Sequence, residues 1–311
     1  MPLARAPGHP NHSSTGGTSR FAPQVWAGKL VEKFYDATVF GEIANTDYEG
    51  DIMDMGDSVV INTTPTLAIN DYSVGQTLAY EDPTSDSVTL NIDKGKYFAF
   101  KVEDIDEYQA NINLMDDWAE DGGNQMRISI DRDMLAGIPA DIDAENAGAT
   151  AGRLSQDIDL GATGAPFVLT KANIIDKIVD LGTVLDEQNV PEVGRWLVLP
   201  AWACGMIKKS DLKDASIAGD GTSIARNGRI GMIDRFTIYL SNNVSITDDG
   251  GTNVSNIIAG HKAGLTFAAQ FTKMETLPNP NQFGQLIRGL NVYGYEVIEG
   301  KYLAHLYATK G

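Results

Sequence analysis

The stretch Val88-Thr-Leu-Asn-Ile-Asp-Lys-Gly-Lys-Tyr-Phe-Ala-Phe-Lys-Val102, followed at once by Glu103-Asp-Ile-Asp-Glu-Tyr-Gln109, decides the fold. Its first part has the alternation of a β-strand, and its second part opens a helical pattern with no loop signal between them. The sequence therefore predicts a long β-hairpin that passes directly into a long helix. A compact enzyme rarely needs that combination, whereas a building block that reaches across to its neighbours does.

Residues 57–102 are predicted to form β-strands separated by turns. Turn-forming residues such as Asp82-Pro-Thr-Ser85 divide the segment into short runs in which apolar and polar side chains alternate. The apolar residues of these runs are Val59, Ile61, Leu67, Ile69, Leu78, Tyr80, Val88, Leu90 and Ile92. Because an isolated hairpin is only marginally stable in water, we expect the segment to lie against something else, and another subunit is an obvious candidate.

From residue 104 the apolar side chains recur every three or four positions, as they do on one face of a helix. They are Ile105, Tyr108, Ile112, Met115, Ala119, Gly122 and Met126. Continued through Leu135, about 30 residues at a rise of about 1.5 Å each give a helix of roughly 45 Å. The pair Gly122-Gly123 inside it predicts either a bend or the close approach of another backbone.

The rest of the chain mixes helices and strands without the rhythm of a parallel α/β protein, which predicts the α+β class. Residues 1–20 are expected to be a flexible arm, and a short amphipathic helix should follow Pro23. A second helix should begin with Thr170 as its N-cap and stop before Pro191. The other predicted elements are a buried strand at 195–200, a polar loop at 211–231, and strands at 236–240, 254–259 and 286–308.

The chain has 311 residues and a net charge of −18. Binding to phosphates or anionic lipid needs clustered Lys and Arg, so this charge argues against direct nucleic-acid contact and against docking on a membrane. The single cysteine, Cys204, allows no disulfide within the chain, which suits a reducing cytoplasm. No signal peptide is visible, and the longest nearly apolar run, residues 196–207, is too short to span a bilayer.

Motifs for catalysis, cofactors or metals are incomplete wherever they begin. Gly219-Asp-Gly221 starts like a dinucleotide loop, but Ile224 stands where the third glycine belongs. Asp141-Ile-Asp143-Ala-Glu145 starts like a calcium loop, but Asn146 replaces the required glycine. The histidines are expected at the surface or in hydrogen bonds; they are His9, His12, His261 and His305. The sequence therefore predicts no enzyme, no cofactor and no metal site.

Eight acidic residues and no basic residue lie between Val102 and Met126. They are Glu103, Asp104, Asp106, Glu107, Asp116, Asp117, Glu120 and Asp121. A solvated helix face is the ordinary explanation, because acids near a helix N-terminus complement the helix dipole. The alternative is an acidic surface set against a basic partner or against confined DNA.

Several motifs resemble those of phage coat proteins, in the same order. They are Phe21-Ala-Pro-Gln-Val-Trp26, Tyr48-Glu-Gly50 followed by Gly56-Asp-Ser-Val-Val-Ile61, Asp93-Lys-Gly-Lys-Tyr-Phe-Ala-Phe100 followed by Val102-Glu-Asp-Ile-Asp106, and Gly231-Met-Ile-Asp-Arg-Phe236. Over residues 21–310 the chain resembles the tailed-bacteriophage major capsid (coat) proteins of the Hong Kong 97-type fold.

The resemblance implies five consecutive parts of an α+β capsid fold. These are an N-terminal arm and short helix (1–46), an extended β-hairpin loop (47–102), a spine helix with a peripheral domain (103–190), an axial domain (191–259), and closing strands of the peripheral domain (260–311). In this family the hairpin lies over the neighbouring subunit.

The resemblance also implies a function. The chain would self-assemble into pentamers and hexamers of an icosahedral head, and enclose double-stranded DNA without reading its sequence. Assembly in the host cytoplasm would leave the chain in the virion. The short arm implies a separate scaffolding protein, and a portal and a decoration protein are further expected partners, whereas a membrane is not.

The residues expected to matter are contact residues. The subunit-interface candidates are Phe21, Val25, Trp26, Leu67, Ile69, Tyr72, Leu78 and Tyr80. The hinge candidates between hairpin and helix are Lys94, Gly95 and Lys96, and the candidates for an acidic inner face are Asp116, Asp117, Glu120 and Asp121. The polar loop 211–230 is expected near a symmetry axis.

Two other classes of protein stay open at this point. A bacterial encapsulin would have the same fold around an enzyme cargo, although no cargo signal is visible. A soluble enzyme or a carbohydrate-binding module would need a convergent titratable cluster or an exposed aromatic row. Such a row would use Tyr293, Tyr295, Tyr302 and Tyr307, for which packing in the core is the simpler interpretation.

Overall fold

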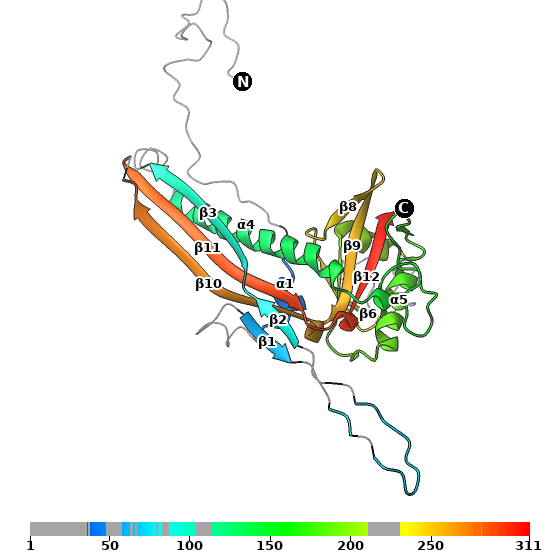
Figure 1. The fold of residues 1–311 in the computed structure, drawn as a ribbon. Helices are drawn as coiled ribbons and strands as arrows, with labels where there is room; N and C mark the ends of the chain where they lie inside the picture. The colour runs from blue at the N-terminus through cyan, green and yellow to red at the C-terminus, as the bar shows by residue number, and fades with distance from the viewer. Residues whose placement is uncertain are drawn as a thin grey trace, which may run out of the picture.

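The computed structural model describes residues 36, 38–47, 58–62, 65, 67–78, 80–82, 87–103, 114–210, 231–280 and 282–311. Four predictions lie outside these residues: the arm with Phe21, Val25 and Trp26, the short helix after Pro23, the helical turns at 104–113, and the polar loop 211–230. The described parts combine helices with three sheets, which confirms the α+β class (Figure 1). No helix among them is both long and apolar enough to cross a bilayer.

The base of the predicted hairpin is a two-stranded sheet. Strand β1 (Ser58–Asn62) pairs antiparallel with β2 (Ser87–Asn91), as the alternating pattern predicts. Ile61 and Leu90 point inward and join a small core with Ile92 and Ala268. The described residues between β1 and β2 form no further strand, although strands were predicted around 67–69 and 78–80. This part of the chain is an extended loop that turns at Val74-Gly75. Figure 1 shows this loop reaching away from the body of the molecule.

A long three-stranded sheet follows the hairpin base. Strand β3 (Lys94–Glu103) pairs antiparallel with β11 (Gly284–Val297), which pairs in turn with β10 (Leu265–Pro278). The sequence pattern assigns residues 94–102 to the hairpin, but their partner is a strand almost two hundred residues later. The chain therefore leaves the hairpin at Ile92-Asp93 and becomes the edge of this sheet.

Helix α4 (Leu114–Gly137) lies along one face of the three-stranded sheet (Figure 1). Gly122 allows this contact, because a Cβ there would stand 2.9 Å from the ring of Phe98. The same ring also fills the space that a Cβ on Gly289 of β11 would need. The prediction of a close backbone is therefore wrong for this pair: the group that approaches Gly122 is the aromatic side chain of Phe98, and nothing lies within 4 Å of a Cβ on Gly123.

The second half of the chain builds a larger mixed sheet. Its strands, in spatial order, are β4 (Phe167–Leu169), β12 (Leu303–Lys310), β9 (Thr252–His261), β5 (Arg195–Leu199), β7 (Phe236–Leu240) and β6 (Met232–Ile233), with β8 (Ile246–Asp249) beside β9. The β4–β12 and β5–β7 pairs are parallel and the other pairs antiparallel. The strand predicted at 195–200 is thus confirmed at the centre of the sheet.

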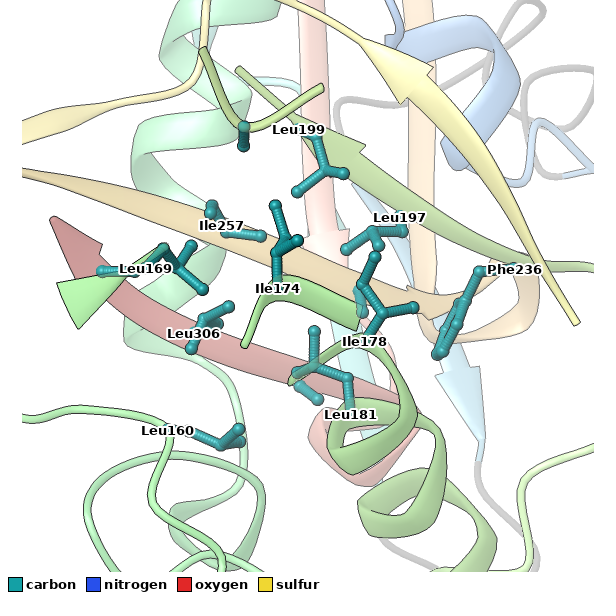
Figure 2. Packing of buried hydrophobic residues seen from close by; sticks show 14 of the residues in the cluster. Leu160, Leu169, Ile174, Ile178, Leu181, Leu197, Leu199, Phe236, Ile257 and Leu306 are labelled. Carbon is teal, nitrogen blue, oxygen red and sulfur yellow. The ribbon is translucent and has the colours of Figure 1, made fainter. Parts of the chain in front are cut away.

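Helices α5 (Ile174–Glu187) and α6 (Ala201–Lys209) cover one face of this sheet. Figure 2 shows Ile174, Ile178 and Leu181 of α5 facing Leu197 and Ile257 of the sheet. The opposite face, with Trp196, Val198 and Ile258, packs on the end of α4. The predicted N-cap of α5 is wrong: the helix begins after Asn173, and the backbone N–H of Thr170 donates to the Asn173 side chain.

Short elements complete the fold. They are the helix α1 (Phe40–Ile43) and the 3-10 turns η1 (Ile138–Ala140), η2 (Ala144–Asn146), η4 (Lys262–Gly264) and η5 (Gly300–Tyr302). Just after α1, Asn45 forms a parallel bridge with Thr266 at the outer edge of β10.

Candidate assembly surfaces

The extended loop at 67–82 carries large apolar side chains with no core of its own. Ile69 is 94% exposed and Tyr80 is 91% exposed. Among the described residues of the loop, the large exposed apolar side chains are Leu67, Ile69, Tyr72, Val74, Leu78 and Tyr80. All of them except Val74 are predicted from the sequence as contact residues. Val74 was not predicted, because it lies in the turn and not in an alternating run. Concentrated apolar exposure of this kind marks an interaction surface.

The described residues of the loop form few hydrogen bonds with one another. The backbone N–H of Ala68 donates to Glu81, and the N–H of Ser73 donates to Gln76. Both bonds are exposed, and neither buries the apolar side chains of the loop. The described part of the loop also carries three acids, Asp71, Glu81 and Asp82, and no base.

A second apolar surface lies on the three-stranded sheet, on the face away from α4. Cross-strand register places Tyr97 beside Leu290 and Lys101 beside Leu286, whereas Phe98 points to the helix. Tyr97 is 78% exposed. Glu275 lies between the apolar groups and pairs with Lys273 and Arg288, whose hydrogen bonds lower the pKa of that carboxyl. The sequence alone does not predict this surface, because the surface forms only when β3, β11 and β10 are paired.

The hinge candidates Lys94, Gly95 and Lys96 lie within the paired part of β3. They stand opposite Tyr293, Val292 and Asn291 of β11. A short distance away, a Cβ on Gly294 would overlap the backbone carbonyl of Asn91, so β2 packs directly on β11.

The acidic candidates lie in the first two turns of α4. Asp116, Asp117 and Glu120 are exposed, and Asp121 is half-buried. Trp118 stands on the same helix with its ring edge against Phe100 of β3, 5.8 Å between centroids. The structure thus places these four acids on one short stretch of α4, at the end of the helix farther from the seven-stranded sheet (Figure 1).

Of two side chains that could react chemically, Cys204 is buried and His305 is partly buried. Burial raises the pKa of the Cys204 thiol to about 11 and lowers the pKa of His305 to about 4. A polar hollow of about 450 Å³ mixes acids and bases; it is lined by Asp143, Glu145, Arg153, Gln188, Glu299, Lys301 and Tyr302. Within the described ranges, no group of three or more His, Cys, Asp or Glu side chains could hold a metal. Tyr293 and Tyr307 are buried, so they form no exposed aromatic row.

Comparison with known proteins agrees with a shell subunit. The family described as phage capsid protein matches residues 85–305. A chain from Mycobacterium phage Che8 superposes with a TM-score of 0.77 at 25% identity, over 93% of this chain and 97% of that one. No curated protein sequence matches.

More distant capsids share the fold. A chain from the capsid of the cyanophage P-SCSP1u has a TM-score of 0.69 at 17% identity, over 98% of both chains. A chain from the mature capsid of bacteriophage PhiM1 has a TM-score of 0.67 at 14% identity, over 99% of this chain and 97% of that one. The chain therefore belongs to the phage capsid protein family, as a bacteriophage major capsid protein with the Hong Kong 97-type fold.

Proposed function

We propose that this chain forms pentamers and hexamers of an icosahedral head that encloses double-stranded DNA. The observation that carries the proposal is the extended loop 67–82, whose apolar side chains are exposed in the single chain. Because burial of apolar surface is the main driving force for association, these side chains gain most by packing on a neighbouring subunit. Closed symmetry then multiplies each modest contact around the shell. The function is structural and needs no catalytic step.

The same proposal assigns roles to the other surfaces. The loop of one subunit packs on a neighbour, and the arm residues Phe21, Val25 and Trp26 reach along an adjacent subunit. The acids at the start of α4 face the enclosed DNA, where like charge prevents the shell from trapping it. A scaffolding protein, a portal and a decoration protein are the expected partners, and assembly takes place in the host cytoplasm.

We propose that the hinge lies nearer the loop than Lys94, Gly95 and Lys96. Lys94, Gly95 and Lys96 belong to a paired strand, and the hairpin base is packed on β11 through Asn91 and Gly294. Both observations favour bending beyond β1 and β2, on the loop side, rather than at β3. Subunits in pentamers and hexamers should then differ most in the direction of residues 67–82.

Co-expression with the scaffolding protein of the same phage tests the proposal. The wild-type chain should give closed shells in electron micrographs, whereas the double variant Ile69→Ser/Tyr80→Ser should remain as small oligomers. Val193→Ser is the matched control, because Val193 is also highly exposed but lies at the turn before β5. Shells formed equally well by the loop variant would overturn the proposal. Particles containing an enzyme instead of DNA, identified by mass spectrometry, would favour an encapsulin.

A further inference from the structure

A buried carboxylate joins three parts of the chain. Asp131 lies on α4 and is 0% exposed. Its Oδ1 atom accepts the backbone N–H groups of Val39 and Phe40, both at 2.9 Å. Its Oδ2 atom accepts the side-chain amide of Asn243, in the turn between β7 and β8, at 2.8 Å. The two oxygens therefore hold the segment before α1 on one side and the β7–β8 turn on the other.

The amide of Asn243 is fixed in one orientation. Its Nδ2 atom faces Asp131, and its Oδ1 atom accepts from Arg132 Nε at 3.1 Å. Turning the amide over would bring an oxygen against the carboxylate and an N–H group against the guanidinium. Arg132 also pairs with Asp36 at 2.9 Å, so the next residue of α4 touches the same two segments.

The charge on Asp131 depends on these donors for its solvation. None of the ion pairs between described residues includes it, so hydrogen bonds alone offset the cost of burying it. Burial raises the pKa of Asp131, while hydrogen bonds from Val39, Asn243, Phe40 and Ser241 act in the opposite direction. If the β7–β8 turn moved away, the carboxylate would lose donors and take up a proton more easily. A neutral carboxyl accepts the two backbone N–H groups less strongly than a carboxylate does.

We propose that Asp131 positions residues 38–43, at the end of the N-terminal arm, on the body of the subunit only while the β7–β8 turn is seated. The arm and the turn share one buried carboxylate, so displacement of either one weakens the hold on the other. This coupling is a property of the single chain. In a shell, this coupling would let the arm and the axial region move together in different lattice positions. That role rests on the function proposed above.

Amide hydrogen exchange of the unassembled full-length chain tests the coupling. Asn243→Asp replaces the donor to Asp131 with a second carboxylate. Exchange in residues 38–43 should become about tenfold faster or more, because the two facing carboxylates share a proton and Asp131 then accepts the N–H groups of Val39 and Phe40 less strongly. Asn242→Asp is the matched control: it makes the same change one residue away on an exposed side chain and should leave that exchange unchanged.

Exchanging the two residues gives the sharper result. The double variant Asp131→Asn/Asn243→Asp restores one carboxylate facing one amide and keeps an acceptor for Arg132. It should slow exchange in 38–43 relative to Asn243→Asp without restoring the wild-type rate, because the acceptor at position 131 is then a neutral amide oxygen. Equal exchange in Asn243→Asp and Asn242→Asp would overturn the proposal, and so would a double variant no slower than Asn243→Asp. If Asp131→Asn alone fails to fold, the first comparison still decides. Since no shell is needed, failure here is distinguishable from failure to assemble.

Discussion

The base and the tip of one hairpin have similar sequences and opposite environments. At the base, Leu90 is 0% exposed, because β1 and β2 pack on the three-stranded sheet. At the tip, Ile69 stands in the same kind of alternating run and is almost fully exposed. An alternating pattern thus specifies which side chains seek burial, but not whether this chain or another provides the partner. For the tip we propose that a neighbouring subunit provides the partner.

The largest difference should appear when the same truncation is made in both places. Leu90→Ala should destabilise the unassembled chain by about 2–5 kcal/mol, because it leaves a cavity beside Ile61 and Ile92. Ile69→Ala should change the free energy of unfolding by less than about 0.5 kcal/mol. Urea unfolding of the scaffold-free chain measures both. Similar losses at the two sites would mean that the tip packs on its own subunit.

A smaller effect should separate two adjacent glycines on α4. Gly122→Ala should cost about 1–3 kcal/mol, because the new methyl group would push the ring of Phe98 out of place. Gly123→Ala has open space around its Cβ and should stabilise the helix by up to about 1 kcal/mol. Thermal unfolding of the two variants checks the sign. Equal shifts would contradict the packing of α4 on the ring of Phe98.

The smallest effect concerns pH in the body of the subunit. Burial alone would raise the pKa of Asp186, but hydrogen bonds from Arg195 and Arg235 lower it below its usual value. The stability that this carboxylate contributes is present above its unfolded pKa and is lost as pH falls through its lower folded pKa. Because the side chain is 40% exposed, we expect no more than about 1 kcal/mol.

The advantage of wild type over Asp186→Asn in urea should therefore be larger at pH 7 than at pH 3. An advantage that stayed constant with pH would show that the carboxylate contributes only through packing. Ile69→Ala serves as the control at both pH values, because it changes no charge.

Local periodicity predicted the elements whose partners are close in sequence or whose burial is complete. The β1–β2 pair, the central strand β5 and helices α4 and α5 followed from period and length. The resemblance to phage coat proteins predicts the loop residues Leu67, Ile69, Tyr72, Leu78 and Tyr80 as contact residues. Their exposure agrees with that prediction, while their contact with a neighbour stays a proposal.

Sequence could not supply the relations that depend on distant partners. The alternation in β3 is real, but it carries no sign that the partner is β11. The runs around 67–69 and 78–80 alternate without forming a ladder, because neither limb has a surface of its own chain to cover. Nothing in the sequence distinguishes Asp131 from the other acids of α4, because its hydrogen-bond partners Val39 and Asn243 are each about a hundred residues away in the chain.

The most direct test is a cryo-electron microscopy map of assembled shells with side chains resolved at residues 67–82. The account predicts that Ile69 and Tyr80 lose most of their exposed surface to a neighbouring subunit, while Leu90 keeps its contacts within its own chain. A loop left in solvent, or folded back on its own subunit, would contradict it.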